Sequence, residues 1–462
     1  MAEPLLSALT KLTEFFSTEQ IEASARRTGF VQRASKITGK LFLALVTFGS
    51  WSTPKTSLAQ LAAKGAQLQK PVAVSPEAIH QRLTRRALAF LQEMIQSAFA
   101  KLHATDTVCD ESLFGSFSAV HIADSTGFGL PDSLKEVFPG AGGSAAQAGA
   151  KIQLVWEYKS STFAHFALIP WNIPDNKYVD AVVGLAQRGA LFLFDLGYFK
   201  LAAFARSAAA HAYFLSRLNH QTTLYTAGAG RLHEWDLVRA LQPESRSLLE
   251  QAIYLGAQER VAARLLAARM PEAVVNERRR RARQVARKRG YTPSHAHLTL
   301  LAWNLFITNV PGTVWTPETV CKAYPLRWQV ELIFKSWKSY LQLATLTTKK
   351  AETTLCYLYG RLLLILLTYA LSPSLRAAVW EKKRRELSLL KLVRHLQAFA
   401  DQWFHALFQA EADLHHFLSR ACATAERLVA KASRKRRTSA QILRKSLHTQ
   451  NDCIELTETL AA

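Results

Sequence analysis

Residues 191–195 read Leu-Phe-Leu-Phe-Asp, four consecutive apolar side chains followed at once by a carboxylate. An uninterrupted apolar run of this kind is typical of a β-strand that is buried on both faces. An earlier apolar stretch closes in the same way, with His-Ile-Ala-Asp at residues 121–124. A carboxylate at the end of a buried strand costs free energy unless it is paired, hydrogen-bonded or bound to a cation. Asp124 and Asp195 are therefore candidate functional residues, although a single such aspartate is more often a turn or cap residue.

Helix-like segments alternate with strand-like ones around these two aspartates. Strands are predicted at residues 118–124, 150–158, 162–169, 191–195 and 212–218. Helices are predicted at residues 176–188 and 200–210. The order of three strands, helix, strand, helix and strand predicts an α/β fold with a mixed sheet covered by helices.

The first 105 residues have the pattern of helices. A short helix at Ser57–Lys64 is followed by a turn and by a second helix start at Ser75, where the serine can cap the helix and Pro76 suits its first turn. The helix that follows is expected to carry four basic side chains: His80, Arg82, Arg85 and Arg86. Two helices with a basic second member suit a helix-turn-helix reader of duplex DNA, and a plain helical hairpin is the alternative.

The chain is strongly basic. Of its 462 residues, 58 are Lys or Arg and 35 are Asp or Glu, which gives a formal net charge of +23. A surface of this charge attracts polyanions, and nucleic acid is the first partner to consider. Charge alone says nothing about chemistry, so a non-catalytic basic DNA-binding protein stays open at this point.

The remaining composition excludes several classes of protein. Five scattered cysteines without a Cys-x-x-Cys pair argue against a disulfide framework or a zinc site and fit a reducing cytoplasm. The longest apolar run, residues 362–371, is about half as long as a bilayer span. We therefore expect no membrane partner. The sequence has no phosphate-binding Gly-x-x-x-x-Gly-Lys-[Ser/Thr] loop, so no nucleotide cofactor is expected.

A dense basic run lies between residues 278 and 289, where eight residues are Lys or Arg and none is acidic. Charge runs usually face water on a solvated helix. A helix that contacts phosphates is the alternative in so basic a chain, and Arg280 and Arg283 are its candidate DNA-binding residues.

The segment AYPLRWQVELIFKSWKSYL contains Tyr324, Arg327, Glu331 and Lys338. On one α-helix, with 100° between successive residues, these four side chains share a narrow face. An apolar stripe beside it would anchor that helix in a core: Val330, Ile333, Phe334, Trp337 and Leu341. The alternative for the charged residues is an ordinary solvated ion pair four residues apart.

Two carboxylates at the ends of neighbouring strands in a basic protein favour a Mg²⁺ site, because Mg²⁺ prefers hard oxygen ligands and leaves positions for phosphate and water. Asp124 is followed by Ser-Thr, Asp195 by Leu and then Gly-Tyr-Phe, and the helix has the spacing Tyr-x2-Arg-x3-Glu-x6-Lys. With these motifs, residues 115–345 resemble the DDE transposases of the bacterial insertion-sequence-four family. A local departure is Pro325, where relatives often carry Arg.

This resemblance implies an RNase H-like core in which Asp124, Asp195 and Glu331 bind two Mg²⁺ or Mn²⁺ ions. It also implies that Tyr324, Arg327 and Lys338 hold DNA phosphates near the metal ions. In this family a tryptophan before the glutamate stacks on a flipped base; Trp303, 28 residues before Glu331, is the matching candidate, with a core aromatic as the alternative.

The predicted division of the chain has five parts. They are an N-terminal helical DNA-binding region at 1–105, the core at 115–218 and 299–350, an insertion subdomain at 219–298 that looks partly helical, and a C-terminal helical region at 351–462. The resemblance implies metal-dependent cleavage of double-stranded DNA at the element's inverted repeats and strand transfer into target DNA. A homodimer on DNA is expected, acting in the cytoplasm at the nucleoid. A nuclease that cuts without joining is the remaining alternative.

Overall fold

The computed structural model describes residues 3–431 except for 52–55, 69–70, 104–112, 143–145, 243–246, 344–345, 347–349, 384 and 410. The chain divides into two compact units. Unit 1 takes residues 1–109, 125–173 and 330–433. Unit 2 takes residues 110–124 and 174–329, together with residues 434–462, which lie outside the described part. The part of the predicted C-terminal region beyond residue 431 is likewise outside it.

Unit 2 is built on a mixed sheet. Its strands are the first residues of β1 (Val120–Leu130), then β4 (Leu191–Phe194), β5 (Tyr213–Arg217), β6 (Leu224–Gly228), β7 (Arg231–Glu234), β8 (Leu248–Leu255), β9 (Val261–Arg269) and β10 (Trp303–Thr308). β1 pairs in parallel with β4, and β4 in parallel with β5. β10 pairs antiparallel with β5 and β9. The α/β class and the mixed sheet predicted from the sequence are confirmed.

The helices of unit 2 connect these strands. They are α7 (Asp175–Val183), η3 (Leu196–Tyr198), α8 (Leu201–Ala209), α9 (Leu237–Ala240), α10 (Glu272–Arg289), α11 (His295–Leu300), α12 (Pro317–Ala323) and the 3₁₀ helix η4 (Tyr324–Trp328). The segment 219–298 contains β6 to β9 as well as α9 to α11, so the partly helical character expected for it is present. β8 and β9 form a regular antiparallel ladder from Leu248 to Leu255.

Unit 1 is mainly helical. Its helices are α1 (Glu3–Phe15), α2 (Thr18–Arg27), α3 (Gly39–Ala44), the π-helix η1 (Leu45–Gly49), α4 (Leu58–Ala66), α5 (Pro76–Arg82), α6 (Arg85–Leu102), η2 (Asp132–Leu134), α13 (Gln329–Tyr340), α14 (Ala351–Ala370), α15 (Ser372–Lys383), α16 (Leu389–Ala398), α17 (Ala400–Ala406) and α18 (Glu411–Leu428). β2 (Ala148–Glu157) and β3 (Thr162–Pro170) pair antiparallel in the same unit.

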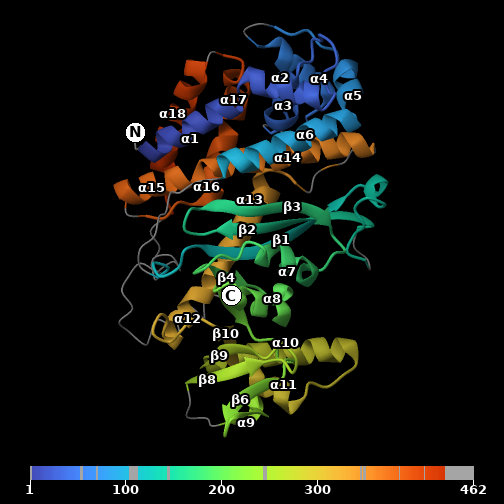
Figure 1. Cartoon of the computed structure of the whole chain (residues 1–462). Coiled ribbons are helices and arrows are strands. Elements are labelled where there is room, and N and C mark those ends of the chain that lie inside the picture. The colour runs from blue at the N-terminus through green and yellow to red at the C-terminus, as the bar shows by residue number, and fades with distance from the viewer. Residues whose placement is uncertain are drawn as a thin grey trace. The chain divides into compact units, whose positions relative to one another are not determined.

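The core of unit 1 is organised by α14, which lies side by side with α6 (Figure 1). The stretch Ala351–Lys383 is long and apolar enough to cross a membrane by length and composition, but 94% of its apolar window is buried inside the protein. Such burial is typical of a core helix. A Cβ added at Gly360 would lie 2.4 Å from the carbonyl oxygen of Val46, so glycine is what permits the close approach of α14 to η1.

The N-terminal helices differ from the expectation at one point. α5 starts after a cap at Ser75, as predicted, but it ends at Arg82. α6 begins anew at Arg85, because the side chain of Thr84 accepts a hydrogen bond from the backbone N–H of Ala87. The prediction of one basic helix is therefore wrong. Its basic residues are shared between the end of α5 and the start of α6.

A candidate active site at the ends of parallel strands

The two aspartates stand at equivalent positions of neighbouring strands. Ala123 of β1 is the register partner of Phe194 of β4, and each is followed directly by an aspartate. The side chain of Asp124 is 16% exposed and that of Asp195 is 40% exposed. The two neighbouring strands thus bring both carboxylates to the same end of the β1–β4 pairing.

A guanidinium group lies between these carboxylates. Nη1 of Arg327 donates a hydrogen bond of 3.0 Å to Oδ2 of Asp124, and its Nε lies 3.5 Å from Oδ1 of Asp195. The Arg327 side chain is 13% exposed, so these contacts are only weakly screened by water. The arrangement places one cation against two carboxylates and compensates their partial burial.

Tyr324 anchors the segment that carries this arginine. Its ring lies 5.1 Å from that of Phe306 on β10, and the residue is 8% exposed. Burial raises the pKa of the Tyr324 hydroxyl to about 12, although the nearby Arg327 acts in the opposite direction. The hydroxyl therefore keeps its proton at neutral pH and can donate a hydrogen bond.

The conformation of residues 324–331 corrects the single-helix prediction. Tyr324–Trp328 is a 3₁₀ helix, and the α-helix α13 begins only at Gln329. Side chains three residues apart are eclipsed in a 3₁₀ helix, so Arg327 stands over Tyr324 rather than 60° away from it. The 100° spacing thus fails before Glu331, because the segment that starts with Tyr324 and Pro325 is wound more tightly than an α-helix.

Glu331 and Lys338 both lie on α13, where the predicted apolar stripe is buried as expected. Glu331 is half-buried in the first turn and Lys338 is exposed in the last. Both belong to unit 1. Their approach to the two aspartates therefore remains a prediction.

The two aspartates fit a divalent cation in their chemistry. Carboxylate oxygens are the ligands that Mg²⁺ and Mn²⁺ prefer, and both groups already face a positive charge. Among the residues that the structure describes, no group of three or more His, Cys, Asp or Glu side chains is close enough together to hold a metal ion. The pair Asp124 and Asp195 would supply part of the ligand set of a metal ion, and the metal-binding role of these residues and of Glu331 remains a prediction.

Trp303 and Trp328 differ in exposure. Trp303 is the first residue of β10 and is 5% exposed, which fits its interpretation as a core aromatic; its base-stacking role remains a prediction. Trp328 follows Arg327 directly and is 47% exposed. The sequence pattern assigned no role to Trp328, although a large aromatic beside a charged site was a usable signal.

The basic run on α10 serves two purposes. Arg278 turns inward: its Nη2 donates 2.8 Å to Oδ1 of Asn304 and its Nη1 donates 3.4 Å to the carbonyl of Trp303, while burial lowers its pKa. Arg280 is exposed and pairs at 2.7 Å with Glu277. Arg283 is exposed. The helix is therefore attached to β10 by one arginine and presents others to solvent.

A family model described as a transposase DDE domain matches residues 115–367, which include Asp124, Asp195 and the segment from Tyr324 to Lys338. The chain belongs to the DDE transposase family. This DDE transposase is 28% identical over 419 residues to the transposase for insertion sequence element IS231B of Bacillus thuringiensis subsp. berliner, with 87% of each chain covered. It is 27% identical over 456 residues to that of IS1151 of Clostridium perfringens, with 94% and 95% covered.

Among solved structures, the DDE transposase shows a limited likeness to the piggyBac transposase synaptic complex with hairpin DNA. The sequence identity is 11% and the TM-score is 0.45, over 91% of this chain and 85% of the other. The family membership itself confirms the predicted resemblance. It makes this chain an enzyme of DNA transposition rather than a non-catalytic DNA-binding protein.

Proposed function

We propose that this transposase cleaves DNA at the ends of its own insertion sequence and joins them to target DNA, with a divalent metal held by Asp124, Asp195 and Glu331. The observation that carries the proposal is the pair of aspartates that directly follow the last register pair of the parallel strands β1 and β4, with the Arg327 guanidinium between them. Two partly buried carboxylates around one cation make a site that attracts positive charge.

When bound, two Mg²⁺ or Mn²⁺ ions would activate a water or a DNA 3′-hydroxyl and stabilise the leaving 3′-oxygen. The chain's own side chains would position the DNA. Arg327 can hold a phosphate through two parallel hydrogen bonds. Tyr324 can donate through its protonated hydroxyl, and Lys338 supplies a compact positive charge.

Further contacts with double-stranded DNA are proposed for the exposed Arg280 and Arg283 on α10. Arg280 already forms an ion pair with Glu277, which partly neutralises its charge. Of these two arginines, Arg283 is therefore expected to make the stronger phosphate contact. The buried Trp303 would stack on a base only after a local rearrangement. Cutting two element ends and joining both needs two active sites, so we propose a homodimer on DNA, acting at the nucleoid in the cytoplasm.

The test is cleavage of a supercoiled plasmid that carries the flanking element ends, in Mg²⁺ or in EDTA. Wild type is compared with Asp124→Asn, Asp195→Asn and Glu331→Gln, which keep side-chain shape and remove charge. Glu272→Gln, at an exposed position in the first turn of α10, is the matched control. We expect metal-dependent cutting by wild type and control, and DNA binding without cutting by the three variants.

The same reaction separates transposition from cleavage alone. Products in which element ends are joined to a second plasmid support strand transfer. Cut ends without joined products, under conditions where a related transposase joins them, would instead support the nuclease alternative. Wild-type binding without any cutting would refute the catalytic proposal.

A further inference from the structure

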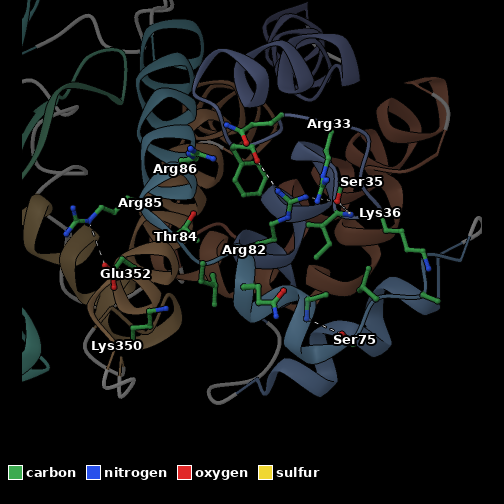
Figure 2. A pocket seen from close by; sticks show the side chains of 18 residues that line it. Arg33, Ser35, Lys36, Ser75, Arg82, Thr84, Arg85, Arg86, Lys350 and Glu352 are labelled. Atoms are coloured by element: carbon green, nitrogen blue, oxygen red, sulfur yellow. Dashed lines mark hydrogen bonds and ion pairs between the residues drawn. The ribbon is translucent and has the colours of Figure 1, made fainter.

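A cavity of about 1210 Å³ opens in unit 1, and its lining residues do not include Asp124, Asp195, Arg327 or Glu331 (Figure 2). Its lining comes from three separate parts of the chain: residues 30–37, 73–86 and 350–352. Six of the 18 lining residues are basic: Arg33, Lys36, Arg82, Arg85, Arg86 and Lys350. One lining residue, Glu352, is acidic, so the wall carries a strong excess of positive charge.

Two of these arginines belong to the structure of the wall. Arg82 donates 3.0 Å from Nη1 to the carbonyl of Phe30 and 2.6 Å from Nη2 to Oγ of Ser35, which ties the end of α5 to the 30–37 segment. Nε of Arg85 lies 3.9 Å from Oε1 of Glu352, the acidic lining residue. The negative charge of Glu352 is thus partly compensated by Arg85, another residue of the same lining.

The other four basic residues are available to a ligand. Arg33, Lys36, Arg86 and Lys350 are exposed, and within the described part of the chain none of them forms an ion pair with a carboxylate. Figure 2 shows them on different walls of the cavity: the 30–37 segment, the start of α6 and the residue before α14. Four such cations around one hollow repel each other in the absence of an anion.

We infer that this cavity, here called the basic pocket, binds the phosphodiester backbone of duplex DNA. The inference rests on the proposed function, in which DNA is the substrate. Cations on three separate walls suit several phosphates in succession better than one, and neutralising phosphates with Lys and Arg is how proteins gain affinity for DNA irrespective of its sequence. The bound strand would lie across the α5–α6 junction, and not along a single basic recognition helix.

The test compares two full-length quadruple variants with the same loss of charge. The pocket variant is Arg33→Ala, Lys36→Ala, Arg86→Ala and Lys350→Ala. The control variant replaces exposed residues that do not line the pocket: Lys135→Ala, Lys177→Ala, Arg394→Ala and Arg420→Ala. Binding to a fluorescent duplex of arbitrary sequence is measured by anisotropy over a range of salt concentrations, and folding is checked by circular dichroism and melting.

We expect the pocket variant to bind about 10- to 100-fold more weakly and to lower the slope of log K against log salt by roughly 2 to 4, because each lost phosphate contact removes about 0.9 from it. The control variant should change affinity by about twofold or less. Equal losses in both variants would show that net charge alone matters and would overturn the inference. Wild-type affinity in the pocket variant would overturn it as well.

A gain of affinity provides a test that misfolding cannot imitate. Glu352→Gln removes the acidic residue of the lining and should strengthen DNA binding by about two- to fivefold, since each charge near a phosphate changes the attraction modestly. The matched control is Glu136→Gln, which is exposed and lies outside the pocket. If DNA affinity rises in both variants, or in neither, the inference that the basic pocket binds DNA is contradicted.

Two further measurements distinguish DNA from a free anion, and the basic pocket from the active site. If inorganic phosphate raises the melting temperature of wild type but not of the pocket variant, while both bind DNA equally, the pocket holds a free anion and the inference fails. At saturating DNA the pocket variant should still cut in Mg²⁺. If wild type does not cut DNA, but the pocket variant still binds DNA more weakly than wild type, the proposed function of the active site fails and the inference about the basic pocket stands.

Discussion

Arg327 and Asp124 form a part-buried ion pair, with Nη1 of the arginine 3.0 Å from Oδ2 of the aspartate. The same guanidinium lies 3.5 Å from Asp195. Arg327 therefore has two competing attractions in the proposed reaction, the carboxylates before a metal binds and the DNA phosphates afterwards. Any metal that binds the aspartates must share them with this arginine or displace it.

Replacing Arg327 separates these two roles. In Arg327→Gln we expect Mn²⁺ to bind about tenfold more tightly, because the metal no longer competes with a charged hydrogen bond worth roughly 1.5–3 kcal/mol. DNA cleavage should nevertheless fall about a hundredfold for loss of the phosphate contact. Mn²⁺ binding is measured by calorimetry, with Arg281→Gln, which pairs with Glu277, as the control. Unchanged Mn²⁺ affinity in Arg327→Gln would show that the arginine does not oppose the metal.

Tyr324→Phe tests the hydroxyl without the ring. The ring contact with Phe306 persists, so we expect the melting temperature to change little. Loss of one hydrogen bond to a phosphate should slow cleavage by about tenfold. Because the pKa of Tyr324 is raised to about 12, the wild-type rate should show no titration of this group between about pH 7 and about pH 10. A variant as fast as wild type would exclude the hydroxyl from the reaction.

His103 predicts an acid-sensitive fold in unit 1. Its Nδ1 accepts a hydrogen bond of 3.3 Å from the N–H of Phe163, its Nε2 lies 3.0 Å from the carbonyl of Leu366, and burial lowers its pKa to about 4. In the unfolded chain histidine binds a proton near pH 6.5, so the unfolded state takes up more protons between about pH 6.5 and about pH 4. The folded state therefore loses stability as the pH falls through that window.

The size of this effect follows from the shift in pKa. Between about pH 7 and about pH 4.5 the wild type should lose about 2.5 kcal/mol more of its unfolding free energy than His103→Gln, which cannot be protonated. Urea unfolding at the two pH values measures the difference. Parallel losses in the two proteins would mean that His103 contributes nothing to acid sensitivity.

A buried ion pair should matter to the stability of unit 1. Nε of Arg376 lies 3.7 Å from Oε2 of Glu386, with side chains that are 6% and 8% exposed. Arg376 also donates 2.7 Å hydrogen bonds to the carbonyl of Tyr158 and to Ser161. Arg376→Met leaves a buried carboxylate without its guanidinium and should cost about 3–5 kcal/mol in urea unfolding.

The double variant Arg376→Met with Glu386→Leu is the informative companion. It removes both charges, so we expect it to be more stable than Arg376→Met alone. If the double variant is the less stable of the two, hydrogen bonding by Arg376, and not the ion pair, dominates at this position.

The sequence predicted the strands around the two aspartates because apolar runs and terminal carboxylates are local signals. It did not predict that β1 continues to Leu130 past Asp124, since Ser-Thr-Gly reads as a turn. The glycine in this stretch is explained by a residue elsewhere in the chain. A Cβ at Gly127 would lie 2.3 Å from the indole of Trp171, and one at Gly149 would lie 2.5 Å from the same ring. These glycines make room for a tryptophan that follows β3.

At the site and at the basic pocket, the sequence predicts what depends on neighbouring residues but not what depends on contacts between distant segments. The spacing of Tyr324, Arg327 and Glu331 marked them as a group, but the 3₁₀ turn that aims Arg327 at the aspartates depends on tertiary packing around Tyr324. The basic pocket joins three segments that are far apart in the sequence. None of these three segments has a residue pattern that would predict the cavity from the sequence.

The two hydrogen bonds from Arg278 to β10 imply that arginine and lysine are not exchangeable along α10. A planar fork can serve the carbonyl of Trp303 and the amide of Asn304 together, which a single ammonium group does not reproduce. Exposed Arg283 carries no such geometric demand. A helix with lysine at every basic position would keep its full charge but lose the paired hydrogen bonds of Arg278 to β10. At the inner face of this helix the identity of the basic residue therefore matters, whereas at exposed Arg283 a lysine would supply the same charge.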